Sequence, residues 1–322
     1  MPPSGQRSRR SALWLTPIAG LYLAGLLWAD RQSGALDGWR DILSMIWLPA
    51  ALSLPFWLVR FLRWQYLLAV AGHRLPLRTS LTCYLAGFAF TATPGKVGEL
   101  VRIRYLTRLG VPSQRVLAAS VFERLNDLFV VLLLALPAAA GEPLAFASAL
   151  TFVSIIVLGC GLAASRPQWL VGAAKRTARF GRAGAQVARL VGWLAAGLSD
   201  LGLWVRPRVL VVSLALGLAA WTLNAATLVV ILDGLGVPLP AHLAWSLLPL
   251  ATIAGAASLI PGGIGSTELV IVTVLAGSGV ALARAVLAAM AARFCTLWLS
   301  IGVGLIAVAI LERGPHLRSG TH

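Results

Sequence analysis

The chain has 322 residues, of which 58% are hydrophobic and 12% are charged, and its mean hydropathy is +0.84. Apolar runs recur that are long enough to cross a hydrocarbon core of roughly 30 Å, which excludes a soluble globular protein. The formal net charge of +16 would indicate nucleic-acid binding in a soluble protein. Here the basic residues lie between the apolar runs, where they set membrane topology, so no nucleic acid is expected as a partner.

Six apolar segments predict full membrane spans of an all-α polytopic protein. Basic residues dominate both ends of the chain, so the N- and C-termini are predicted to be cytoplasmic. No cleavable signal peptide is evident before the first span. The connection after the second span carries Arg60 and Arg63 and is expected to be cytoplasmic as well. The predicted spans are residues 12–29, 42–59, 115–137, 144–164, 208–232 and 284–311.

Residues 77–93 decide the topology of the first half. A complete crossing would place the basic residues between Lys96 and Arg115 outside, against the positive-inside rule. We therefore predict a re-entrant hairpin, in which the chain turns at Pro94-Gly95 and leaves by the same face. A second hairpin is predicted from residues 243–260 and 266–278, entering from the opposite face. Non-helical backbone at this depth is tolerated where protein or a water-filled cavity surrounds it.

The two predicted hairpins share a sequence pattern that indicates an internal duplication. Pro94-Gly95 pairs with Pro261-Gly262, and Gly98 pairs with Gly265. Further matches follow at a constant offset of about 169 residues. Because the two copies enter from opposite faces, the repeat is predicted to be inverted. The matches at this offset are Glu99-Leu100-Val101 with Glu268-Leu269-Val270, Gly110 with Gly279, Arg115 with Arg284, and Arg124 with Arg293.

The whole chain, residues 1–322, is predicted to be one integral membrane domain. The first repeat half covers about residues 42–165 and the second about 208–311, with a basic cytoplasmic loop at 166–208 between them. Apolar residues recur at helical spacing from Val187 to Leu201 in this loop, which predicts an interfacial helix on anionic lipid headgroups. The alternative is a docking surface for a cytosolic partner, and a homo-oligomer is left open.

Charged residues inside the two copies are the main candidates for function. Four of the eleven acidic residues lie there, although each charge at a helix centre costs about 2.5–3.5 kcal/mol on insertion scales. Such residues normally face an interior and find partners. Arg124 and Arg293 are expected to bind Glu99 and Glu268, or a ligand's phosphate. The alternative is permanent ion pairs that only lock helices together. The acids are Glu99, Glu123, Asp127 and Glu268, of which the middle two share a helix face.

The Pro-Gly turns belong to the same candidate site. Helices broken near the middle of two inverted halves are how transporters place backbone dipoles and charges around a substrate. Glycine permits a tight turn and a close approach of the backbone to a ligand. Lys96 and Arg63 are further basic candidates for headgroup contact. The turn residues are Pro94, Gly95, Gly98, Pro261, Gly262, Gly263 and Gly265.

Residue types that hold metals or cofactors are sparse. The three cysteines, Cys83, Cys160 and Cys295, lie in apolar segments without a CxxC spacing, and none of the four histidines is near a carboxylate pair. No phosphate-binding P-loop is present. We therefore expect no metal and no cofactor, and no use of ATP by this chain alone.

These residues resemble the flippase-like membrane region of the lysylphosphatidylglycerol synthases and their stand-alone relatives, over almost the whole chain. The resemblance implies lipid translocation, because in the two-part synthases a separate soluble C-terminal domain transfers the aminoacyl group. The chain stops at His322 without room for that domain, so lysyl transfer is not expected. Relatives without it are linked to hopanoid handling and lipid-linked glycan pathways, so membership does not fix the substrate. The resemblance rests on Arg63-Trp64, the segment from Pro94 to Leu100, the segment from Glu123 to Asp127, and Pro261 to Gly265 leading to Glu268.

The sequence therefore predicts a flippase or translocase of the bacterial inner membrane, not an enzyme. It would move the headgroup of a lipid or lipid-linked intermediate through a polar groove between the two halves. Arg124 and Arg293 would bind phosphate, and the four acids would hold these arginines. One alternative is an integral membrane transferase with Glu123 and Asp127 as acid and base, which lacks an evident nucleophile. Another is a non-transporting assembly partner that presents its basic loop.

Overall fold

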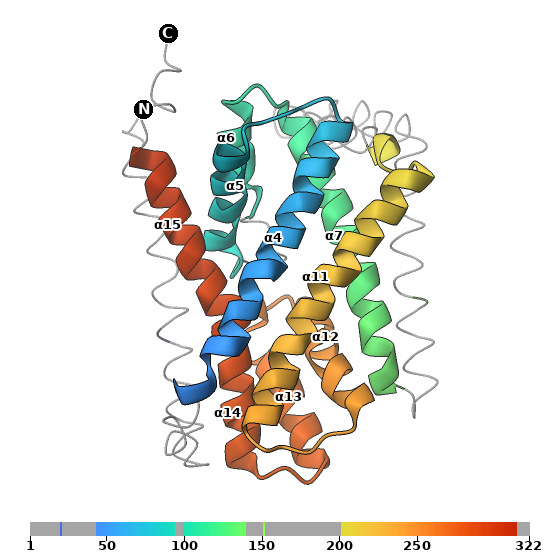
Figure 1. The fold of residues 1–322 in the computed structure, drawn as a ribbon, viewed down its shortest axis with the longest axis vertical. Coiled ribbons are helices and arrows are strands. Elements are labelled where there is room, and N and C mark those ends of the chain that lie inside the picture. Colours follow the sequence, from blue (N-terminus) through green and yellow to red (C-terminus); the bar gives the residue numbers. More distant parts are fainter. Residues whose placement is uncertain (1–19, 21–42, 94–98, 140–150, 152–200, 314–322) are drawn as a thin grey trace, which may run out of the picture.

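The computed structural model describes residues 20, 43–93, 99–139, 151 and 201–313, and this part of the chain is helical without a strand (Figure 1). The predicted all-α class is confirmed for these residues. Two of the described helices, Pro207–Gly234 and Leu282–Arg313, are long and apolar enough to cross a membrane. The predicted span 12–29 and almost all of 144–164 lie outside the described residues. The number of spans therefore stays a prediction.

The first half begins with α4 (Trp47–Val70), which runs from the lower to the upper end of the molecule in Figure 1. From the upper end, α5 (Leu77–Ala86) and the 3-10 turn η2 (Gly87–Phe90) lead back towards the middle. The short α6 (Val101–Thr107) lies beside α5 in the upper part, and α7 (Ser113–Ala135) then runs to the lower end.

The second half has the opposite direction. Helix α11 (Pro207–Gly234) begins at the upper end and packs antiparallel to α4 (Figure 1). Helix α12 (Ala241–Ala257) enters from the lower end, the turn η6 (Pro261–Gly263) reverses the chain, and α13 (Ser266–Gly277) returns to the lower end. The pairs α5–α6 and α12–α13 thus lie at opposite ends of the molecule.

The last long helix crosses the molecule in one piece with a local defect near its middle. Helix α14 (Leu282–Arg293) is followed by a π-helical segment (Phe294–Trp298) and then by α15 (Leu299–Arg313). Ser53 of α4 donates a hydrogen bond of 2.9 Å to the carbonyl of Cys295 in the π segment. The wider π turn widens the helix directly after Arg293, and such turns are frequent at functional sites.

The backbone repeats at the offset seen in the sequence. Gly110 and Gly279 both have positive φ angles, 84° and 82°, directly after α6 and α13. In each turn the N–H of the next valine bonds back into the preceding helix, the pattern that ends helices at a left-handed glycine. The long helices then begin at corresponding positions, Ser113 and Leu282. The two hydrogen bonds are Val111 N–H to the Leu106 carbonyl (3.1 Å) and Val280 N–H to the Leu275 carbonyl (3.0 Å).

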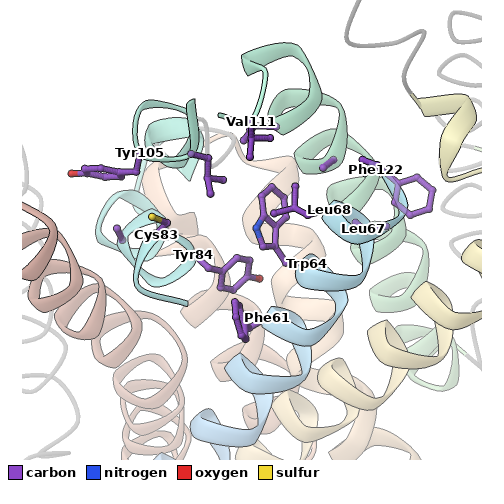
Figure 2. Close-up of a cluster of buried hydrophobic side chains, with 14 of the residues drawn as sticks. Phe61, Trp64, Leu67, Leu68, Cys83, Tyr84, Tyr105, Val111 and Phe122 are labelled. Atoms are coloured by element: carbon purple, nitrogen blue, oxygen red, sulfur yellow. The ribbon is translucent and has the colours of Figure 1, made fainter. Parts of the chain in front are cut away.

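Two large apolar clusters form the core, one centred on each half. In the first half, large side chains from α4, α5, α6 and α7 converge, among them Trp64, Tyr84 and Phe122 (Figure 2). In the second half, Leu247 and Ile271 belong to a separate cluster of buried residues from α11 to α14. The first cluster also contains Ala220 of α11 and Ala307 of α15, so apolar packing joins the two halves as well.

One predicted boundary is wrong. The second span was expected to end at residue 59, with Arg60 and Arg63 in a cytoplasmic connection. Helix α4 instead continues to Val70, and both arginine side chains are buried inside the protein, with Arg63 0% exposed. The charges that indicated a loop are neutralised by carboxylates of α7, so the helix carries them within the fold.

Gly304 of α15 packs directly against the backbone of η2. Any larger side chain at this position should therefore destabilise the fold. A Cβ atom at this position would overlap the backbone nitrogen of Ala89 and lie 2.6 Å from the carbonyl carbon of Phe88. Gly302, in the same helix, has nothing within 4 Å of such an atom. Small residues commonly mediate close helix packing in membranes.

We expect Gly304→Ala to lower the free energy of unfolding by about 1–3 kcal/mol, the usual cost of overpacking. Gly302→Ala should be neutral or slightly stabilising, because alanine favours helices over glycine. Thermal unfolding of the two purified variants in detergent checks this prediction. Equal melting temperatures would contradict the packing of η2 on α15.

Candidate functional site

A cavity lies between the two halves, where the hairpins and the long helices meet. Its volume is about 330 Å³, and residues of α4, α7, α11, α12 and the π segment line it. Most of its wall is apolar or uncharged, as in small-molecule sites generally. The charged side chains of the wall are Arg60, Glu99, Arg124, Asp127 and Arg293.

Glu123 of α7 is the centre of a buried cluster of charges beside this cavity. Its side chain is 0% exposed. Its Oε1 accepts hydrogen bonds from the Tyr84 hydroxyl at 2.8 Å, from Arg60 at 3.2 Å and from Arg63 at 3.4 Å. Its Oε2 accepts a hydrogen bond from Arg102 at 3.2 Å. A carboxylate this deep is stable in its charged form only because several guanidinium groups surround it.

Asp127 binds the arginines of α4 from one turn further along α7. Its Oδ1 lies 2.5 Å from Arg63 Nη2 and its Oδ2 lies 3.1 Å from Arg60 Nη2. Asn126, between the two acids, accepts a further hydrogen bond of 3.0 Å from Arg63. Arg60 and Arg63 are three residues apart and therefore share one face of α4, and Glu123 and Asp127 share the opposing face of α7. The two helices are thus joined by a ladder of ion pairs.

Arg102 of α6 connects this ladder to the first hairpin. Besides Glu123 it binds Glu99, with Nη2 to Oε2 at 2.8 Å. Its guanidinium also lies over the rings of Trp64 and Tyr84, at 4.6 and 4.8 Å from their centroids. A planar cation in contact with two aromatic rings and two carboxylates is well compensated, which explains how it remains buried at 1% exposure.

Two arginines of this cluster, Arg60 and Arg124, line the cavity, and the side chain of Arg124 has the larger exposed fraction. Its side chain is 29% exposed. Its Nη2 lies 2.8 Å from Oε2 of Glu99, while its distances to Glu123 and Asp127 are 3.9 and 3.8 Å. Arg124 therefore makes one close ion pair and keeps the rest of its guanidinium towards the cavity.

The second half repeats this ion pair at the matching positions. Arg293 Nε lies 2.8 Å from Oε1 of Glu268, as Arg124 lies 2.8 Å from Glu99. Arg293 also donates a hydrogen bond of 2.6 Å to the carbonyl of Gly262. The other oxygen of Glu268 accepts the backbone N–H of Gly265 at 2.9 Å, which caps the first turn of α13. One arginine and one glutamate thus fix the turn of the second hairpin.

The tip of the second hairpin lies against Ala92 of the first hairpin, beside the cavity. Gly262, Gly263 and Gly265 all have positive φ angles, so the Pro-Gly turn has the conformation that its glycines were expected to permit. A Cβ atom on Gly262 would lie 3.3 Å from Cα of Ala92 in the first hairpin. Ala92 also packs with Leu297 of the π segment in a small apolar cluster. The first turn itself, with Pro94, Gly95, Lys96 and Gly98, lies outside the described residues.

The described charges of the first half do not balance. Four arginines, Arg60, Arg63, Arg102 and Arg124, meet three carboxylates, while the second half contributes one of each. Among the described residues the cluster therefore has one positive charge in excess. An uncompensated charge in a buried site is costly, and an anion in the cavity would remove that cost.

Sequence reasoning identified most of this site but assigned two roles differently. Glu99 and Glu268 hold Arg124 and Arg293, whereas Glu123 and Asp127 bind mainly Arg60, Arg63 and Arg102. Glu268 holds Arg293 but does not line the cavity. Arg60 and Arg102 were treated as cytoplasmic charges. Their signal in the sequence was the spacing of Arg60 and Arg63 on one helix face, matched by the spacing of Glu123 and Asp127. Within the described part of the chain, no group of three His, Cys, Asp or Glu side chains is placed to hold a metal.

Comparison with known families decides the class of the protein. Residues 14–304 match the family described as the lysylphosphatidylglycerol synthase TM region. The chain belongs to this family. The resemblance predicted from Arg63-Trp64 and the Pro-Gly segments is thereby confirmed. Membership makes the chain a membrane protein of a family named for lipid modification, and the lysylphosphatidylglycerol synthase TM region covers both hairpins and all the charged residues described above. Comparison with curated proteins gives no match.

Proposed function

We propose that this protein is a lipid translocase of the bacterial inner membrane. A lipid headgroup enters the cavity between the two halves while its hydrocarbon chains stay in the bilayer. The observation that carries this proposal is a cavity lined by Arg124 and Arg293, one from each half, beside a buried cluster whose described residues carry one positive charge in excess. A phosphate group suits this site, because guanidinium groups bind phosphate oxygens with paired, charge-assisted hydrogen bonds.

The arrangement of the hairpins supports transport between the two faces. The pairs α5–α6 and α12–α13 lie at opposite ends of the molecule, and the tip of the second meets Ala92 of the first beside the cavity. We propose that both are re-entrant, that six helices span the membrane, and that both termini are cytoplasmic. Inverted repeats with broken helices at the midplane are the usual architecture for alternating access to one site.

The charged residues support binding and transport rather than catalysis. Glu99, Glu123 and Asp127 each bind at least two arginines, so none of them is placed as a free acid or base. We therefore propose that the lysyl transfer in the family's name is not an activity of this membrane region. The basic residues of the 166–208 loop, almost all outside the described part, are proposed to rest on anionic headgroups.

Translocation of fluorescent lipids in proteoliposomes tests the proposed function. Purified protein should speed the loss of outer-leaflet fluorescence for an anionic phospholipid well above the rate in protein-free vesicles. The matched control is the same protein denatured before reconstitution. If well-folded protein moves none of an anionic, an aminoacylated and a neutral lipid, the proposed function is contradicted.

The topology has its own test, which uses two exposed positions related by the repeat. Thr107 ends α6 and Ala276 lies near the end of α13 at the matching position. In a background with Cys83, Cys160 and Cys295 replaced by alanine, Ala276→Cys should react with a membrane-impermeant maleimide in intact cells. Thr107→Cys should react only after permeabilisation. Labelling of both from the same side would rule out the inverted arrangement.

A further inference from the structure

Asn224 of α11 is a buried polar side chain that the ion pairs leave unused. It is 7% exposed and lines the cavity. No hydrogen bond joins its amide to another described residue, and its polar atoms are not among the fully enclosed ones that lack a partner, so they stay open to the cavity. Trp221 lies one turn earlier on the same face and its ring also lines the cavity, but its indole N–H has no partner and is shielded from the cavity. Asn224 is therefore an uncharged hydrogen-bonding group that α11 presents to the cavity.

Hydroxyl groups provide further hydrogen-bonding atoms around the cavity. Thr252 of α12 and Thr296 of the π segment both line the wall. Each donates its proton to a carbonyl of its own helix, at 2.8 and 2.7 Å. Their oxygens therefore keep lone pairs for a ligand, and the Asn224 amide offers both donors and an acceptor. A ligand with hydroxyl groups can bond with all of these side chains.

The charged part of the same cavity disfavours a cation. Glu99 and Asp127 are the carboxylates among the described lining residues, and both are already bound by arginines at 3.1 Å or less. An ammonium group would have to displace a guanidinium from one of them. It would also add to the positive charge already in excess, and like charges at close range repel strongly in a site shielded from water.

From these observations we infer the substrate class: a lipid phosphodiester whose headgroup beyond the phosphate is uncharged and hydroxylated. The inference rests on the proposed function. The phosphate binds at Arg124, and the hydroxyl groups bind at Asn224, Thr252 and Thr296. The lipid has a single negative charge, which offsets the excess positive charge of the described cluster. A glycerol headgroup on a phospholipid and a sugar on a polyprenyl phosphate share this chemistry. An aminoacylated headgroup does not share it.

The test compares four lipids in proteoliposomes of the wild-type protein. They are phosphatidylglycerol, lysylphosphatidylglycerol, phosphatidic acid and a polyprenyl phosphate carrying one hexose. We expect phosphatidylglycerol or the glycosylated lipid to move at least about tenfold faster than lysylphosphatidylglycerol. Which of the first two moves faster distinguishes a phospholipid from a lipid-linked sugar. Equal or faster movement of lysylphosphatidylglycerol overturns the inference while the proposed function stands. Movement of no lipid overturns both.

Two variants of Asn224 separate recognition from folding. Asn224→Asp places a carboxylate where the neutral amide stands, so the preference for the hydroxylated lipid over lysylphosphatidylglycerol should fall at least about tenfold. Asn224→Leu removes the hydrogen bonds without adding charge. It should slow the hydroxylated lipid about tenfold and leave phosphatidic acid, which has only the phosphate, nearly unchanged. Melting temperatures of both variants in detergent control for misfolding. Preference ratios equal to the wild type in both variants would overturn the role of Asn224.

Discussion

Replacement of Glu123 by glutamine is expected to prevent stable folding. The glutamine keeps the size of the side chain but removes the charge that faces Arg60, Arg63 and Arg102. Four arginines would then meet two carboxylates within the described cluster. Removing one partner of a buried ion pair costs about 3–5 kcal/mol, because the other charges stay buried without compensation. The yield of monodisperse protein in detergent and its melting temperature measure this loss.

The matched control for this variant is Glu312→Gln, at the half-exposed end of α15, which should melt as the wild type does. A second-site change tests the cause. Adding Arg102→Met to Glu123→Gln leaves three arginines and two carboxylates, which is the net charge of the wild-type cluster, so the double variant should be less destabilised than the sum of the two single changes. If the destabilisation of the double variant equals the sum for the two single variants, the cluster does not act as one unit.

Arg124→Gln should have the opposite profile, with lipid movement lost and the fold preserved. The change leaves three arginines and three carboxylates in the cluster, so the described charges balance. It removes the guanidinium that faces the cavity at 29% exposure. Losing a hydrogen bond to a charged group costs about 1.5–3 kcal/mol, which corresponds to a roughly 10- to 150-fold lower rate of translocation. The rate in proteoliposomes and the melting temperature in detergent are both needed to check this.

Arg104→Gln is the comparison for Arg124→Gln. Arg104 lies on the exposed face of α6 and does not line the cavity, so its loss removes one positive charge without touching the site. Transport by this variant should remain within about twofold of the wild type, as expected for a surface substitution. If Arg124→Gln moves lipid as fast as Arg104→Gln does, Arg124 has no part in headgroup binding.

The sequence alone was enough to predict most of the helices. It was also enough to predict the two equivalent ion pairs, Arg124 with Glu99 and Arg293 with Glu268. The predicted span 208–232 lies within α11, and the hairpin segments 243–260 and 266–278 correspond to α12 and α13 within a few residues. Long apolar runs and a repeat at constant offset produce strong signals. The pairing of Arg124 with Glu99 followed because both copies conserve the same two residues at the same separation.

The burial of the arginines of α4 and α6 was missed for a physical reason. The positive-inside rule treats an arginine after an apolar run as a sign that the chain has left the membrane. Arg60 and Arg63 are compensated by Glu123 and Asp127, about sixty residues later in the chain, and nothing local in the sequence reveals that compensation. The cavity is lined by elements of both halves, so no single segment of the sequence reveals it. The remaining signal was the spacing of Arg60 and Arg63 on one face of a helix, which matches the spacing of Glu123 and Asp127 on another.

The excess positive charge that the described residues give the cluster has a consequence for the energy source of the proposed transport. When an anionic lipid with one charge occupies the site, the charges of site and lipid cancel, so a voltage across the membrane exerts little force on the loaded state. The empty site keeps its positive charge. An inside-negative potential therefore favours the inward-facing orientation of the empty site by up to about 2.3 kcal/mol per 100 mV. The potential would then return the empty carrier to the cytoplasmic face and drive net export of the lipid without ATP.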